Sequence, residues 1–137
     1  MSLKVKFRID FDDAHAVGPG KIALLERMRD CGSLSQAARE LDMSYRRAWQ
    51  LLDSLNTSFN DPVIVTSIGG KGGGGSEITP LGLALIETFR ALEKDITVIA
   101  QQRFKPLRNR VAPATPSPRR AATKTVRGKR VRESKRT

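Results

Sequence analysis

The sequence predicts a mainly α-helical domain with a small amount of β structure. Three observations indicate this class. Apolar residues recur at helical spacing through most of residues 20–103, a glycine-rich stretch at 69–75 separates two short β-type segments, and large apolar residues become rare after Pro106. Hydrophobic residues make up 39% of the 137 residues, which is enough for one modest core and suggests a single folded domain.

A half-buried strand is predicted at the start of the chain, because apolar and polar residues alternate over residues 3–11. Its apolar members are Leu3, Val5, Phe7, Ile9 and Phe11. We expect a loop over residues 12–19 and then a first helix from Gly20 to about Cys31. Gly32 is the expected left-handed residue at the end of this helix, since glycine adopts that conformation without a steric penalty.

Two further helices joined by a tight turn follow directly. Ser33 and Gln36 form a capping-box pattern that starts a helix over Leu34–Leu41. Asp42 occupies the turn, where it tolerates the left-handed region better than most residues, and Ser44 caps a helix over Tyr45–Phe59. The positions expected to be buried between the two helices are Ala38, Leu41, Met43, Ala48, Leu51, Leu52 and Leu55.

A hairpin and a long helix complete the predicted domain. Val63–Val65 and Glu77-Ile78 are the strands, and the glycine loop Gly69–Gly75 joins them. Thr79 as N-cap and Pro80 at the first helical position start the last helix, which runs to about Arg103 before Pro106 ends it. This order of elements is that of a winged helix-turn-helix with an N-terminal strand, a two-stranded wing and a long C-terminal helix.

The start of the Tyr45–Phe59 helix presents side chains that suit DNA. Arginine can bind guanine through two hydrogen bonds, and glutamine can bind adenine in the same way. Hydroxyl groups can donate hydrogen bonds to phosphates. The predicted contacts on this helix are Ser44, Tyr45, Arg46, Arg47 and Gln50. Trp49 either packs beneath the wing or contacts DNA, and we favour packing.

Two residues outside this helix are further candidates for DNA contact. Arg39 either approaches a phosphate from the preceding helix or pairs with nearby acids. Lys71 is the one non-glycine residue within the glycine loop at the wing tip, from which it is predicted to reach an adjacent groove or phosphate.

The last helix is predicted to make a homodimer. Its apolar residues recur at spacings of four, three, four and three, which is a short coiled-coil seam. The seam consists of Leu85, Phe89, Leu92, Ile96 and Ile99. The alternative is a helix that lies only on its own domain. A two-fold dimer would place two recognition helices ~34 Å apart and would call for a palindromic operator.

Neither catalysis nor a metal site is predicted. Cys31 is the only cysteine, so no intrachain disulfide can form, which suits the cytoplasm. It has no visible histidine partner, so we interpret it as packing at the end of a helix rather than as a nucleophile. His15 lies in a polar loop, and we interpret it as solvated rather than as a metal ligand. Because we find neither a signal peptide nor an apolar stretch that could span a bilayer, we expect a cytoplasmic chain with no membrane partner. We expect no enzyme activity, no cofactor and no small-molecule ligand bound by this chain alone.

Three segments of the chain resemble a known family. Residues 32–38, 43–49 and 69–75 are similar to the N-terminal DNA-binding domain of ModE-type molybdate-responsive transcription regulators, although the helix pair alone also resembles LysR-type regulators. The resemblance covers about residues 18–104. It implies a dimeric winged-helix regulator of molybdenum uptake or cofactor genes, with Ser44–Arg47 on the recognition helix and Lys71 in the wing. Family members sense molybdate through C-terminal domains, whereas here we expect a short Pro- and Arg-rich tail after the last helix.

The net charge of +11 comes from that tail. Residues 105–137 contain twelve Lys and Arg against one acid, Glu133, whereas the two signs balance over residues 1–104. We therefore expect a DNA-binding and dimerisation domain at residues 1–104 and a disordered basic Pro/Arg-rich tail at 105–137.

The predicted function is a sequence-specific, DNA-binding transcription regulator, dimeric on a palindromic operator in double-stranded DNA. The alternative is a sequence-tolerant architectural nucleic-acid binder driven by the tail, because basic tails attract any polyanion. A protein-interaction module is a third, less favoured class.

Overall fold

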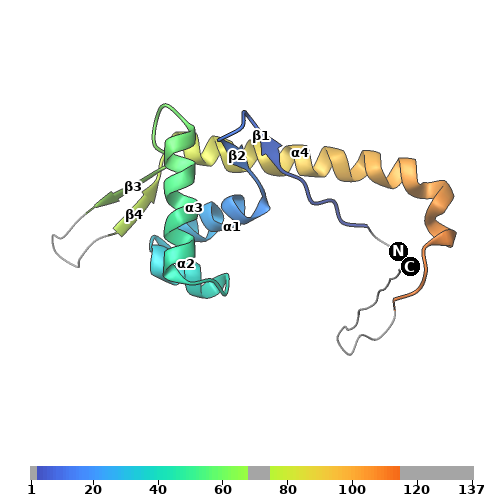
Figure 1. Cartoon of the computed structure of the whole chain (residues 1–137), viewed down its shortest axis with the longest axis horizontal. Coiled ribbons are helices and arrows are strands. Elements are labelled where there is room, and N and C mark those ends of the chain that lie inside the picture. Colours follow the sequence, from blue (N-terminus) through green and yellow to red (C-terminus); the bar gives the residue numbers. More distant parts are fainter. Residues whose placement is uncertain (1–2, 68–74, 115–137) are drawn as a thin grey trace, which may run out of the picture. The chain divides into compact units, whose positions relative to one another are not determined.

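The computed structural model describes residues 3–67 and 75–114, and the chain divides into two units, residues 1–103 and 104–137. The predicted class, mainly α with small β, is confirmed (Figure 1). Its elements are β1 (Ile9–Asp10), β2 (Ala16–Val17), α1 (Pro19–Cys31), α2 (Leu34–Glu40), α3 (Tyr45–Ser58), β3 (Ile64–Ser67), β4 (Gly75–Ile78), α4 (Pro80–Phe104) and the 3-10 helix η1 (Lys105–Arg110).

The N-terminal strand is much shorter than predicted. Only β1 forms a ladder, with β2, which lies inside the segment expected to be a loop; Ile9 pairs with Val17 and Asp10 with Ala16. Residues 3–8 keep the predicted alternation of half-buried and exposed side chains without being a strand. The prediction failed here because alternation reports burial, whereas a strand also needs a partner for its backbone groups.

The caps of α1, α2 and α3 follow the sequence closely. Gly32 ends α1 with φ 69°, and the Ser33 hydroxyl accepts a hydrogen bond from the Gln36 amide. Only half of the predicted capping box is present, because the Gln36 side chain bonds instead to Arg39 and Glu40. Both helices of the predicted pair end one residue early, α2 at Glu40 and α3 at Ser58.

One core joins α1, α2, α3, the start of the hairpin and α4. Ile22, Leu24 and Leu25 of α1 are fully buried at its centre, and Phe7 stacks on Phe89 of α4 with ring centroids 4.6 Å apart. The buried residues are Val17, Ile22, Leu24, Leu25, Met28, Leu34, Ala37, Ala38, Ala48, Leu52, Leu55, Val63, Ile64, Ile86 and Phe89. Of the seven positions predicted to be buried, four are in this set, and Leu41, Met43 and Leu51 are half-buried against it.

The N-terminus of α4 is anchored to the segment that enters the hairpin. The Thr79 amide donates to the Val63 carbonyl, and its hydroxyl accepts from the Gly82 amide at 3.0 Å, so the predicted N-cap is confirmed. Gly82 is buried so tightly that a Cβ atom there would meet the Val63 carbonyl oxygen and would lie 2.6 Å from Cγ1 of Ile78. The helix can therefore sit at this depth only with glycine at position 82.

A bidentate ion pair ties α4 to α1. Arg90 donates to both carboxylate oxygens of Glu26, at 2.7 and 2.8 Å, and also to Glu93 at 2.8 Å. The guanidinium of Arg90 holds the pKa of Glu26 below its ordinary value of 4.5, so this carboxylate is charged at neutral pH.

The last α-helix ends within one residue of the predicted Arg103, but a turn of tighter helix continues past Pro106. α4 ends at Phe104, and the next six residues tighten into η1, with Pro106 in its first turn. Proline is compatible with this position because the first amides of a helix have no intrahelical acceptor. The expected disorder is thus wrong for residues 105–110, and residues 115–137 lie outside the described part. Among the described residues, no helix combines the length and apolar character needed to cross a membrane.

We predict that Gly82→Ala destabilises the domain by about 1–3 kcal/mol, because the added methyl group meets a backbone carbonyl that cannot rotate away. Urea denaturation followed by circular dichroism measures this. Gly20→Ala is the matched control, since a Cβ atom at Gly20 has nothing within 4 Å. The control should be neutral or stabilising by up to ~1 kcal/mol. Equal stability of the Gly82 variant and the unmodified chain would contradict this packing.

Candidate nucleic-acid interface

The first turns of α3 form an exposed polar and aromatic face. Ser44 accepts a hydrogen bond from the Arg47 amide at 3.0 Å and so begins the helix as predicted. The side chain of Tyr45 is 57% exposed, and Ser44, Arg46, Arg47 and Gln50 are also exposed. The five residues predicted to contact DNA on this helix therefore all face solvent on one short segment.

The turn between α2 and α3 fixes how this face is presented. Asp42 adopts φ 58°, the left-handed conformation expected from the sequence. The Met43 amide then donates to the Ala38 carbonyl at 3.0 Å, which closes the turn. Ala37, Ala38 and Ala48 are at most 3% exposed. Of these, Ala38 and Ala48 were the small residues expected where α2 meets α3. Ala37 was not among the residues expected to be buried.

Arg39 lies on the exposed side of α2. Its guanidinium donates to the Gln36 side chain at 3.0 Å, and none of the described ion pairs includes it. The pairing with acids that was weighed for Arg39 is thus replaced by a contact with a neutral amide. Its positive charge is not neutralised within the described residues.

Two basic residues that the sequence did not single out, Lys21 and Arg8, lie near Arg47 or each other. Arg8 is itself paired with Asp10 at 2.7 Å. Lys21 of α1 donates to the Ala16 carbonyl and to the Ser54 hydroxyl of α3, both at 2.7 Å. Burial lowers the pKa of Lys21 from its ordinary value of 10.5, and the nearby charges of Arg8 and Arg47 lower it further. Arg47 is therefore part of a group of three cations. No spacing pattern in the sequence links these three positions, because they meet only through tertiary contacts.

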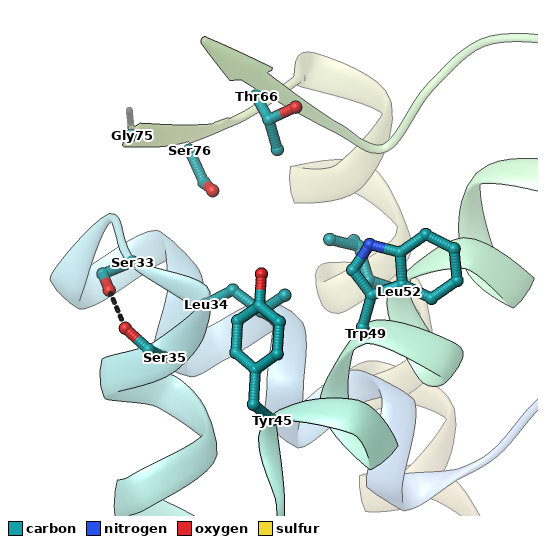
Figure 2. Close-up of a pocket in the computed structure, with 9 residues that line it drawn as sticks. All are labelled: Ser33, Leu34, Ser35, Tyr45, Trp49, Leu52, Thr66, Gly75 and Ser76. Atoms are coloured by element: carbon teal, nitrogen blue, oxygen red, sulfur yellow. Dashed lines mark hydrogen bonds between the residues drawn. The ribbon is translucent and has the colours of Figure 1, made fainter. Parts of the chain in front are cut away.

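A pocket of about 340 Å³ opens beside Tyr45 (Figure 2). It lies among the start of α2, the start of α3 and the β3–β4 hairpin. Its lining consists of Ser33, Leu34, Ser35, Tyr45, Trp49, Leu52, Thr66, Gly75 and Ser76. Trp49 remains 50% exposed here, so packing accounts for only part of its surface.

Asn56 of α3 anchors the hairpin beside this face. Its side-chain oxygen accepts from the amides of Val63 at 2.9 Å and Ile64 at 3.3 Å, and its nitrogen donates to the Ile64 carbonyl at 3.2 Å. On the opposite strand, the Ser76 amide donates to the Gly32 carbonyl at 3.0 Å. Both strands are thus tied to the helices. Sequence analysis missed Asn56, since an isolated asparagine within a helix has no distinguishing pattern.

The wing tip lies outside the described residues, which include neither Lys71 nor residues 69–74 of the glycine loop. Gly75, expected in that loop, begins β4. The hairpin itself agrees with the prediction, with Ile64 opposite Ile78 and Val65 opposite Glu77.

The residues of the predicted dimer seam have unequal surroundings. Phe89 is 4% exposed and stacks on Phe7, and Leu85 packs against the same core. Leu92 and Ile96 are half-buried, and Ile99 is 52% exposed. The structure thus assigns Phe89 to the core of its own chain, and the exposed apolar part of the seam lies further along α4, at Ile99.

The described residues contain no group of three potential metal ligands. His15 bonds to Asp12 at 2.9 Å in an exposed loop, and the Cys31 thiol donates to the Ser33 carbonyl at 3.3 Å.

Similarity to known proteins agrees with the resemblance seen in the sequence. No family model matches the chain. Over 88 residues it is 34% identical to the molybdenum transport protein ModE of Azotobacter vinelandii, a match that covers 64% of this chain and 33% of that protein. The molybdenum-pterin-binding protein MopB of Rhodobacter capsulatus is 39% identical over 80 residues, 58% of this chain and 30% of MopB. The DNA-binding transcriptional dual regulator ModE of Escherichia coli K12 is 32% identical over 98 residues, 69% of this chain and 37% of the regulator.

The chain is a ModE homologue. It spans about a third of the length of these relatives, whose names describe regulation, molybdenum transport and molybdenum-pterin binding rather than enzymes. Two of the three segments that suggested ModE, residues 32–38 and 43–49, lie in this homologue on α2, the turn and α3.

We predict that Asn56→Ala destabilises the chain by about 1–3 kcal/mol, because it removes the partners of the Val63 and Ile64 amides. Urea denaturation measures the loss. Amide hydrogen exchange should also show faster exchange at Val63 than in the unmodified chain. Asn60→Ala, which changes an exposed asparagine just after α3, should stay within about 0.5 kcal/mol. Unchanged protection at Val63 in the Asn56 variant would contradict the anchoring role.

Proposed function

We propose that this chain is a sequence-specific DNA-binding transcription regulator that reads the major groove with α3. The observation that supports it best is the exposed group Ser44, Tyr45, Arg46, Arg47 and Gln50 at the start of a helix held by a tight turn against α2. In a helix-turn-helix, this part of the second helix contacts base edges. The E. coli relative is itself named a DNA-binding regulator.

The chemistry of this group separates two roles. Arg46, Arg47 and Gln50 have side chains that can make paired hydrogen bonds with guanine or adenine, so they are the proposed source of sequence preference. Ser44, Tyr45, Arg39 and, from the wing, Lys71 are proposed to hold phosphates, which fixes the position of α3 without reading sequence. One of the two arginines is expected to read a base while the other holds a phosphate.

A homodimer on a palindromic operator is the second part of the proposal. One α3 contacts too few bases for tight specific binding, and two copies would double the contacts. The distal part of α4 offers the surface for this, since Val98 and Ile99 are 47% and 52% exposed. We further propose that the controlled genes concern molybdenum, in line with the names of the relatives, and that the protein acts in the cytoplasm.

Replacing Arg46 or Arg47 with Ala should weaken binding to a duplex selected from a random pool by ~1–3 kcal/mol for the residue that reads a base, and should lower sequence preference. Fluorescence anisotropy at fixed salt measures both. Arg29→Ala removes an exposed arginine of α1 whose partner is Asp30, and it should keep the preference. Full affinity in the double Arg46 and Arg47 variant would show that α3 does not read this duplex.

The same assay addresses the tail-driven alternative, which the charge of residues 105–137 suggests. A chain without these residues should keep its preference for the selected duplex and show a smaller dependence of affinity on salt. Loss of nearly all binding to every duplex would instead favour an architectural nucleic-acid binder.

Sedimentation at micromolar concentration should show a dimer. The double variant Ile96→Glu and Ile99→Glu should raise the dimer dissociation constant by about 100-fold or more, because it places charges where apolar surface is proposed to be covered. Ala91→Glu, at an exposed position of α4 outside the seam, is the control and should remain dimeric. A strict monomer of the unmodified chain, with and without DNA, would refute this part of the proposal.

A further inference from the structure

The pocket between the helix pair and the hairpin has an unusual lining. Two aromatic side chains, Tyr45 and Trp49, and the hydroxyl groups of three serines and one threonine surround its volume of about 340 Å³. None of its lining residues is charged. In Figure 2 the Tyr45 hydroxyl points into the space between the serines of α2 and the hairpin, and Trp49 lies on the other side of Tyr45.

Several hydrogen-bond donors at this pocket have no partner among the described residues. These are the Tyr45 hydroxyl, the Trp49 indole N–H and the hydroxyls of Thr66 and Ser76. By contrast, Ser33 accepts from the Gln36 amide and lies 3.3 Å from the Ser35 hydroxyl. The unpaired donors come from α3 and from both strands of the hairpin, so a ligand that bound them would bridge these elements.

The chemistry of the lining favours a phosphodiester. Phosphate oxygens only accept hydrogen bonds, which matches four unpaired donors, and a deoxyribose can pack against an aromatic ring. A free small anion would need a cation in the pocket to offset its charge, and no lining residue supplies one. A phosphodiester within a duplex does not depend on the pocket alone, because the rest of the interface also holds the DNA.

The position of the pocket agrees with this ligand. The proposed function places α3 in the major groove and the hairpin beside it, toward the adjacent groove. A sugar–phosphate strand separates any two neighbouring grooves of a duplex, so it must pass between these elements. The hairpin is anchored by Asn56 and by the Ser76 amide. Together these hydrogen bonds fix the distance between the two sides of the pocket.

We propose that this pocket holds one phosphodiester of the bound duplex, with Trp49, Thr66 and Ser76 as its contacts beside Tyr45. This inference rests on the proposed function and adds three residues that set the depth and register of α3. It also gives Trp49 a role that accounts for its exposed half. The contacts are independent of sequence, which separates them from those of Arg46 and Arg47.

Thr66→Val, Ser76→Ala and Trp49→Phe each remove one donor and keep most of the side-chain volume. Each should weaken binding about three- to tenfold, and equally for a duplex selected from a random pool and a scrambled duplex of the same composition. The ratio of the two affinities should not change. Thr57→Val, which removes an exposed hydroxyl at the far end of α3, is the control and should bind as the unmodified chain does. Thermal unfolding verifies that every variant is folded.

A set of selected duplexes, each with one phosphate replaced by a neutral methylphosphonate, locates the contact. At one position in each half-site, the replacement should weaken binding by the unmodified chain. It should have a much smaller effect on binding by the three variants. Three folded variants that bind both duplexes normally, while Arg46→Ala binds weakly, would overturn the pocket proposal and leave DNA reading by α3 intact. The pocket proposal would also be overturned if the three variants bind weakly but no methylphosphonate position distinguishes them from the unmodified chain. If the unmodified chain binds neither duplex, both proposals fail.

Discussion

The close approach of α2 to α3 is the constraint on which the rest of the structure depends. Ala38 and Ala48 are almost completely buried, and larger side chains there would push the helices apart. The left-handed Asp42 lets the chain turn from α2 into α3 within the four residues that separate them. With the apolar side of α3 held in this way, its polar side must face solvent, so the same packing that stabilises the domain also exposes Tyr45 and the arginines.

Three links transmit this geometry to the remaining elements. Asn56 connects α3 to the hairpin, the close contact at Gly82 sets the depth of α4, and the Arg90 ion pair joins α4 to α1. These links differ in kind, since one is a set of amide hydrogen bonds, one a steric fit and one an ion pair. Of these, the partly exposed ion pair should contribute least to stability, because solvent screens its charges. The position of the hairpin relative to the helices depends on Asn56 for one strand and on the Ser76 amide for the other.

The electrostatic character of the chain is divided between two regions with different consequences. The excess of charge lies in residues 105–137, where it favours any polyanion. In the described part of the chain, Arg39, Arg46 and Arg47 take part in no ion pair. Arg47 lies near Lys21, whose pKa is lowered first by burial and further by the charges of Arg8 and Arg47. A local group of this kind, combined with neutral hydroxyl donors around Tyr45, suits a surface that must fit one arrangement of DNA rather than attract nucleic acid in general.

Local patterns in the sequence were sufficient for the caps, the left-handed residues and the apolar face of each helix, because these depend on residues within one or two turns. Ser33, Ser44, Gly32 and Asp42 all behave as predicted for that reason. Partners distant in the chain were decided only by the tertiary structure. The first strand is short because most of its residues have no strand partner, and Phe89 is covered by Phe7. Thr66 and Ser76 lie beside Tyr45 only in the folded chain. Periodicity shows that a side chain is buried, but not which other side chain will cover it.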